Sequence, residues 1–250
     1  GYGEIKKENS EDSLPSIYNP SYVNTTTDLD ELTKGIKKTK SARLCLYGVP
    51  GTGKSAFGKY LADMLDKPLL LKKGSDLISK WVGGTEQNIA NAFKEASDEN
   101  AVLVFDEVDS FLADRTQAKQ SWEVTQVNEM LVQMENFDGV FIATTNLMDN
   151  LDKASLRRFD LKLEFDSLQP EQAWKMFKEF SKELKLPKVD KVFKQEIQSL
   201  KQLTPGDFSA VVRQNRFRPI HSVEDFIERL QDEIAVKDIS TDKVMGFLVS

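Results

Sequence analysis

Apolar runs and amphipathic periods alternate along the first two thirds of the chain. Short, mostly apolar stretches predict strands over residues 44–47, 69–71, 102–105, 140–143 and 161–165. Between them, apolar side chains recur at spacings of three and four, which predicts helices over residues 54–65, from Thr85 onward with Thr85 as the N-cap, and around 124–134. Because strands that are apolar throughout are buried on both faces, the pattern predicts an α/β fold in which helices cover a parallel sheet.

The two ends of the chain follow different patterns. The N-terminal residues are rich in Asn, Ser, Thr and Pro and sustain no apolar period, which predicts a polar tail. After about Ser167 only helical periods occur, and Ser222 with Asp225 is typical of the cap of the last helix. The sequence therefore predicts a tail over residues 1–25, an α/β domain over 26–167 and a small all-helical domain over 168–250.

Composition narrows the class of protein. Of the 250 residues, 40% are hydrophobic and 30% charged, which is ordinary for a globular chain. The net charge of −6 disfavours a nucleic-acid binder, and a single histidine excludes a multi-histidine metal centre. One cysteine, no signal-peptide pattern and no apolar run long enough to span a bilayer predict a cytoplasmic protein without a membrane partner. Because residue 1 is Gly rather than Met, we expect the natural protein to extend beyond this sequence.

The first motif with defined chemistry is Gly48-Val49-Pro50-Gly51-Thr52-Gly53-Lys54-Ser55, which fits the phosphate-loop pattern G-x-x-x-x-G-K-[ST]. Its glycines let successive backbone N–H groups face a phosphate, and the following helix N-terminus adds a positive field. Lys54 can reach the β- and γ-phosphates, and the Ser55 hydroxyl can ligate Mg²⁺. The predicted nucleotide-binding residues are Gly48, Val49, Pro50, Gly51, Thr52, Gly53, Lys54, Ser55, Ala56 and Asp106.

Two further strands end in polar residues. Asp106 and Glu107 follow one apolar strand, and Asn146 follows another. Ligands of open α/β sheets bind at the carboxyl ends of strands. Since neighbouring side chains on a strand point in opposite directions, we expect Asp106 to join Ser55 in the Mg²⁺ shell and Glu107 to polarise the attacking water. Asn146 can hold the same water or a γ-phosphate oxygen, and the absence of an Asn/Thr-Lys-x-Asp motif favours adenine over guanine.

In chain order these motifs resemble those of the AAA+ ATPases, specifically the protein-remodelling branch that includes katanin, spastin and the Cdc-type unfoldases. The resemblance also covers Ser75–Glu86, Thr145-Asn146 and Leu151–Asp160, and extends over roughly residues 28–215. It implies a five-stranded parallel P-loop sheet with a helical lid and hydrolysis of Mg–ATP. It also implies a homo-oligomer, usually a hexameric ring when ATP is bound, that acts on a polypeptide client. By this resemblance Lys54 and Ser55 are Walker A groups, Asp106 and Glu107 are Walker B groups, and Asn146 is sensor 1.

Two more segments take a role from the resemblance. Lys80, Trp81 and Val82 fall on the first pore loop, where an aromatic side chain grips an extended polypeptide. Arg157 and Arg158 match the arginine-finger segment, which reaches the γ-phosphate bound by a neighbouring subunit. Relatives usually have two residues between these arginines, whereas here they are adjacent, which leaves open which one is the finger.

Two other functions stay open. A nucleic-acid motor or loader would share the nucleotide chemistry, although the net charge and Trp81 weigh against it. An ATP-dependent binding switch would bind without hydrolysing, although Glu107 and Asn146 weigh against it. Cys45 alternates with leucines in a predicted buried strand, which indicates a core residue. No motif encodes the client.

Overall fold

The computed structural model describes residues 17–81, 83–109, 121–146 and 153–246. The chain divides into two compact units. The first contains residues 25–48 and 54–164, and the second contains residues 17–24, 49–53 and the chain from Phe165 onward.

One five-stranded sheet organises the first unit. Its strands are β1 (Ala42–Gly48), β2 (Leu69–Lys73), β3 (Val102–Asp106), β4 (Val140–Thr145) and β5 (Leu161–Phe165). They lie in the order β2-β3-β4-β1-β5, so β4 and β1 are neighbours although about a hundred residues separate them. The parallel register pairs Leu44 with Ile142 and Leu103 with Phe141. The prediction of a parallel P-loop sheet with five strands is confirmed.

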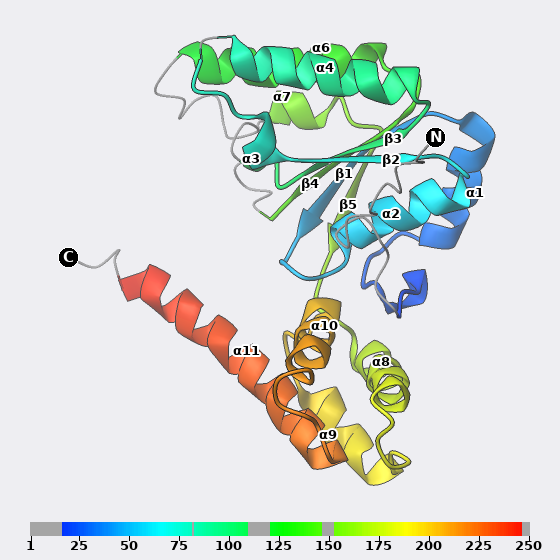
Figure 1. Cartoon of the computed structure of the whole chain (residues 1–250), viewed down its shortest axis with the longest axis vertical. Helices are drawn as coiled ribbons and strands as arrows, with labels where there is room; N and C mark the ends of the chain where they lie inside the picture. Colours follow the sequence, from blue (N-terminus) through cyan, green and yellow to red (C-terminus); the bar gives the residue numbers. More distant parts are fainter. Residues whose placement is uncertain (1–16, 82, 110–120, 147–152, 247–250) are drawn as a thin grey trace, which may run out of the picture. The chain divides into compact units, whose positions relative to one another are not determined.

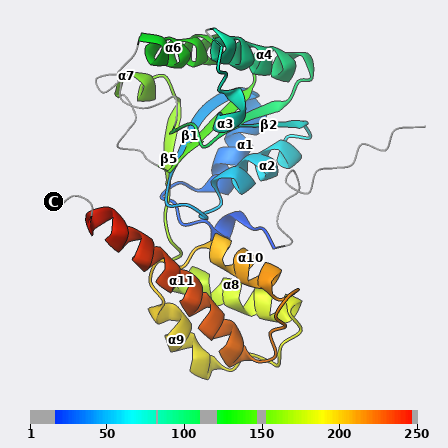
Figure 2. The same cartoon turned by 60° about the vertical axis from the view of Figure 1, so that its left-hand side comes forward.

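Helices cover both faces of this sheet. They are α1 (Leu29–Thr39), α2 (Lys54–Met64), α3 (Gly74–Leu77), α4 (Gly84–Asp98), α6 (Ser121–Asn136) and α7 (Lys153–Leu156). Figures 1 and 2 show α4 and α6 on one face and α1 and α2 on the other. The connection from β1 to β2 therefore runs over one face through α2, whereas those from β2 to β3 and from β3 to β4 run over the other face through α4 and α6.

Strand β3 shows why the apolar runs contain no polar positions. Phe105 faces α4, where its ring centroid lies 5.4 Å from that of Phe93 in an edge-to-face contact. Val104 faces α2, and a Cβ at Gly58 would lie only 2.9 Å from the Val104 Cγ2 atom. Side chains of both orientations are fully buried, so a polar residue on either face would lose its hydration.

The start of α4 differs from the expectation that Thr85 caps it. The N-cap is Gly83, in the left-handed conformation with φ of 77°. Thr85 lies inside the helix and its hydroxyl oxygen accepts a hydrogen bond from the Ser79 N–H at 2.8 Å. Thr85 therefore fixes the preceding loop instead of capping the helix.

The second unit consists of helices around an aromatic core. They are the 3₁₀ turns η1 (Pro20–Tyr22) and η3 (Lys191–Phe193), and the helices α8 (Pro170–Glu183), α9 (Lys194–Ser199), α10 (Pro205–Gln214) and α11 (Val223–Gly246). Phe177 stacks on Phe226 with 4.8 Å between ring centroids. At the start of α11 the Asp225 N–H donates to the Ser222 hydroxyl oxygen at 3.1 Å, so the predicted cap is confirmed.

The predicted polar tail differs from the structure at its C-terminal end, while residues 1–16 lie outside the described residues. Val23 is buried, and the Gln172 side-chain amide donates to the carbonyl oxygens of Ser21 at 3.0 Å and Val23 at 3.1 Å. Residues 17–24 therefore pack within the second unit, because backbone hydrogen bonds replace the apolar period that the sequence lacks there. The domain boundaries expected from the sequence stay predictions.

Cys45 lies in the middle of strand β1. Cys45 is fully buried in β1, and burial raises the pKa of its thiol to about 12, which keeps it protonated and unreactive at neutral pH. The prediction of a core residue is confirmed.

No helix in the described part of the chain has the length and apolar character to cross a membrane. A cytoplasmic location stays a prediction.

Candidate functional site

The predicted nucleotide-site residues of the first unit lie where three neighbouring strands end. Strand β1 ends at Gly48, β3 ends at Asp106, and Asn146 directly follows β4. Since β4 pairs in parallel with both β1 and β3, these ends share one edge of the sheet. The structure thus brings Gly48, Lys54, Ser55, Asp106 and Asn146 to the same edge.

Lys54 begins helix α2, and its side chain reaches back to the end of β1. Its Nζ donates a hydrogen bond to the Gly48 carbonyl oxygen at 2.8 Å, and only 7% of the residue is exposed. Burial, partly offset by the nearby carboxylates of Asp106, Asp109 and Glu107, lowers the pKa of Lys54 from 10.5 to about 8. The ammonium group is therefore held in a position where an anionic ligand would compensate its burial.

Ser55 and Asp106 supply the most direct contact between the two predicted motifs. The Ser55 hydroxyl donates to Asp106 Oδ1 at 2.7 Å, although 51 residues separate them in the chain. Both are oxygen donors of the kind that Mg²⁺ prefers, and Mg²⁺ sites on phosphates use few protein ligands. The described residues contain no cluster of three or more His, Cys, Asp or Glu that would form an all-protein metal cage. The donor set therefore fits a magnesium ion shared with phosphate oxygens.

Thr144 holds the two acids in place, and the sequence analysis missed it. Its hydroxyl donates to the Asp106 carboxylate and accepts a hydrogen bond from the Glu107 N–H at 3.1 Å. Thr145 donates to the Asp109 carboxylate in the same way. Two adjacent threonines at the end of a buried strand were the available signal, because buried hydroxyls need hydrogen-bond partners.

Glu107 lies outside the strand, in contrast to the expectation that strand alternation separates it from Asp106. Strand β3 ends at Asp106, and Glu107 has a left-handed backbone with φ of 56°. A Cβ at Gly74 would lie 2.4 Å from the Glu107 carbonyl oxygen, so only glycine allows this close approach. Glu107 is exposed, whereas Asp106 is half-buried. The two acids differ in environment because of this turn, not because of the pleat.

The middle of the phosphate loop, Val49–Gly53, belongs to the second unit. Gly51 has a φ of 77°, and its carbonyl oxygen accepts a hydrogen bond from the Gly206 N–H at 2.8 Å. A Cβ at Gly206 would lie 2.9 Å from the Gly51 Cα, so a larger residue would displace the loop. Val49, Pro50 and Gly51 are exposed, Thr52 is buried, and Gly53 and Ala56 are half-buried.

Trp81 stands out as an exposed aromatic side chain, with 83% of its surface accessible. A small network orders its loop: the Trp81 N–H donates to Ser79 Oγ at 3.2 Å, and the Gly84 N–H donates to the Trp81 carbonyl oxygen at 3.0 Å. Trp81 is therefore not part of the hydrophobic core. Lys80 is also exposed, and Val82 lies outside the described residues.

The two adjacent arginines differ in their partners. Arg158 forms an ion pair with Glu135 of α6, with 2.7 Å between Nη1 and Oε1. Arg157 is exposed and forms no ion pair with any residue that the structure describes. Leu151 and Asp152, at the start of the same motif, lie outside the described residues. Within the described residues, Arg158 thus has an ionic partner in its own chain and Arg157 has none.

We expect Lys54→Met to stabilise the nucleotide-free protein at pH 7 by about 1–2 kcal/mol. Below pH 8 the ammonium is protonated in both the folded and unfolded chain, so the full cost of burying it is present. Between about pH 8 and 10.5 the unfolded chain holds more protons, and wild-type stability rises relative to the variant. Urea unfolding at pH 7 and pH 10 measures the difference.

The control for this prediction is Lys94→Met, at an exposed lysine of α4. Its effect on the free energy of unfolding should be the same at both pH values. A Lys54→Met effect that is likewise independent of pH would contradict a buried ammonium at this position.

Comparisons with known proteins agree with this geometry. Residues 44–167 match the family described as "ATPase family associated with various cellular activities (AAA)". Relatives include the protein SUPPRESSOR OF K(+) TRANSPORT GROWTH DEFECT 1 of Arabidopsis thaliana, 31% identical over 72% of this chain and 43% of that protein. Vacuolar protein sorting-associated protein 4 of Dictyostelium discoideum is 33% identical over 54% of this chain and 32% of its own length. The cell division cycle protein 48 homolog of Archaeoglobus fulgidus is 28% identical over 84% of this chain and 29% of its own length.

The chain thus spans less than half the length of each of these relatives. The match nevertheless covers the sheet from β1 to β5 with the residues at its carboxyl edge. The resemblance noted from the motifs is confirmed, and this chain carries an AAA ATPase domain.

Proposed function

We propose that the chain binds Mg–ATP and hydrolyses it, and that it works as a ring-forming homo-oligomer that remodels a polypeptide client. The observation that carries the nucleotide part is the 2.7 Å contact of Ser55 with Asp106. This contact joins the phosphate loop to the acid at the end of β3, as a magnesium–phosphate site requires.

Each residue at the strand ends has a part in this proposal. The Lys54 ammonium neutralises charge on the β- and γ-phosphates, and the glycine-rich backbone donates N–H groups to them. Ser55 and Asp106 would hold Mg²⁺, which when bound offsets the charge of the phosphate oxygens. The exposed Glu107 accepts a proton from the attacking water, while Asn146 orients that water or a γ-phosphate oxygen.

The assembly and the client are supported by two exposed side chains. Arg157 has no ionic partner among the described residues, so it is available to the γ-phosphate held by a neighbouring copy. Trp81 exposes 83% of its surface on an ordered loop, which suits a non-selective grip on an extended polypeptide. The relatives' names refer to protein sorting and cell division, and a protein client accords with both. We also propose that the ring is a hexamer when ATP is bound and that the protein is cytoplasmic.

Trp81→Ala tests the grip on the polypeptide. We expect ATP affinity within about twofold of wild type and less than a tenth of the wild-type rate of client unfolding. The described hydrogen bonds of Trp81 all lie within residues 79–84, so its removal leaves the phosphate loop intact. Phosphate release measures ATP hydrolysis. Client unfolding is measured as the loss of fluorescence from a fluorescent protein that carries a peptide tail.

Trp81→Tyr is the matched variant, because it keeps an aromatic ring and should keep most of the unfolding activity. Full unfolding by Trp81→Ala would refute the grip, while absence of phosphate release from the wild-type chain would refute the proposed hydrolysis and leave a binding switch. Hydrolysis stimulated by RNA or single-stranded DNA, with a steep dependence on salt, would instead support a nucleic-acid motor.

A further inference from the structure

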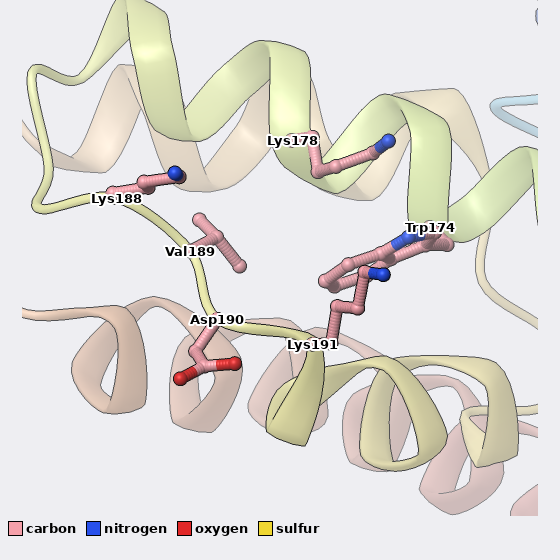
Figure 3. A pocket seen from close by; sticks show the side chains of 6 residues that line it. All are labelled: Trp174, Lys178, Lys188, Val189, Asp190 and Lys191. Atoms are coloured by element: carbon pink, nitrogen blue, oxygen red, sulfur yellow. The ribbon is translucent and has the colours of Figure 1, made fainter.

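A basic hollow lies on the second unit, and no role has been assigned above to any residue that lines it. Its volume is about 490 Å³, and it is lined by Trp174, Lys178, Lys188, Val189, Asp190 and Lys191 (Figure 3). These residues come from α8, from the segment that follows it and from η3. A hollow of this size is within the range of sites that bind small molecules or short peptide segments.

Three lysines and one acid line the hollow, so its formal charge is positive. Lys178, Lys188 and Lys191 form no ion pair with any residue in the described part of the chain. Asp190 is the one acid in the lining, and its carboxylate accepts the Val192 N–H at 3.4 Å as the cap of η3. Figure 3 shows that carboxylate directed away from Trp174 and Lys178. Three ammonium groups therefore face a hollow in a chain whose overall charge is negative.

The base of the hollow is a buried aromatic side chain. Trp174 is only 7% exposed and lies parallel to Phe177, with 6.2 Å between ring centroids. The Lys178 Nζ lies 5.6 Å from the Trp174 ring centroid, a cation–π contact that holds this ammonium at the hollow. Val189 packs against the core of the second unit, and Val192, three residues further along the chain, is 72% exposed. Val192 does not line the hollow, but it belongs to η3 together with the lining residue Lys191.

This combination favours a polypeptide over other anions. The lysines approach from three separate segments, so they suit carboxylates spaced along a chain better than one phosphate group that needs converging donors. Nucleobases require an open aromatic face for stacking, but Phe177 and Lys178 occupy the faces of Trp174. The exposed Val192 offers a place for an aliphatic side chain of the same segment.

We propose that this hollow binds an acidic polypeptide segment that carries aliphatic side chains between its carboxylates. The carboxylates pair with Lys178, Lys188 and Lys191, and the aliphatic groups contact Val189 and Val192. The site is separate from nucleotide hydrolysis, so it provides a second contact for a partner or client on the helical unit.

Fluorescence anisotropy with the full chain tests this site. The probe is a short fluorescein-labelled peptide that alternates glutamate and leucine. We expect the double variant Lys178→Gln, Lys191→Gln to weaken binding about tenfold, since each exposed ion pair contributes up to a fewfold in affinity. Raising the salt from about 50 to 200 mM should weaken wild-type binding as well, because exposed charges are screened.

The matched control is Lys182→Gln, since Lys182 lies on the same helix, is paired with Glu179 and does not line the hollow. It should bind the peptide like wild type, and Lys54→Ala should too, which separates this site from the nucleotide site. The proposal is overturned by equal binding of the glutamine–leucine peptide, or by an unchanged affinity in the double variant. Stronger displacement of the probe by an oligonucleotide of equal charge than by unlabelled peptide would also overturn it.

Discussion

Glu107→Gln is expected to bind ATP with nearly unchanged affinity and to release phosphate about 10²- to 10³-fold more slowly than the wild-type chain. The carboxamide has almost the shape of the carboxylate but cannot accept a proton from water. The Glu107 N–H bond to Thr144 belongs to the backbone, so the turn that presents the side chain is preserved. Steady-state phosphate release and equilibrium ATP binding, both in excess Mg²⁺, measure the two halves of the prediction.

The same variant should accumulate ATP-bound oligomers, because bound ATP is no longer consumed. Mass measurement with and without Mg–ATP detects them. Glu99→Gln is the control, since Glu99 is an exposed glutamate at the end of α4. This variant should hydrolyse ATP at the wild-type rate. Hydrolysis by Glu107→Gln at the wild-type rate would remove Glu107 from the proposed mechanism and leave Asp109 as the next acid to test.

The strands were predictable because burial on both faces leaves a continuous signal. Every position of β4 is buried, so the sequence there contains no polar alternation that would suggest a half-exposed strand. The phosphate loop was predictable for a similar reason, since its backbone curvature and charge restrict the residue types at Gly53, Lys54 and Ser55.

Features that depend on contacts between distant segments were not predictable in the same way. Thr144 acts on Asp106 across 38 residues, and nothing in the local sequence of either strand specifies that pairing. The close approach of Gly74 to Glu107 and that of Gly206 to Gly51 likewise depend on packing. The N-cap of α4 is Gly83 and not the expected Thr85, because the Thr85 hydroxyl oxygen accepts a hydrogen bond from the Ser79 N–H. Local rules identify candidates for such roles, and tertiary contacts choose among them.

Which of Arg157 and Arg158 acts as the arginine finger also depends on tertiary contacts. Because Arg158 forms an ion pair with Glu135, we predict that Arg157 is the finger. We expect Arg157→Ala to lower hydrolysis by about 10³-fold in the assembled state, the effect typical of a lost arginine finger. Arg158→Ala should lower it about tenfold or less, because its guanidinium is engaged within its own subunit. Both rates are measured at a protein concentration at which Glu107→Gln forms oligomers with Mg–ATP.

Mixing Arg157→Ala with Glu107→Gln then tests whether the arginine acts on a neighbouring copy. Each variant alone is inactive, but in an equal mixture about one quarter of the interfaces in a ring join an intact Glu107 to an intact Arg157 from the next subunit. The mixture should therefore regain hydrolysis well above that of either variant, whereas an arginine acting within its own subunit would leave it inactive. A mixture of Arg158→Ala with Glu107→Gln serves as the comparison and should show no regain beyond the activity of Arg158→Ala itself. Regain in the second mixture alone would assign the finger to Arg158 and contradict the choice made from the Glu135 ion pair.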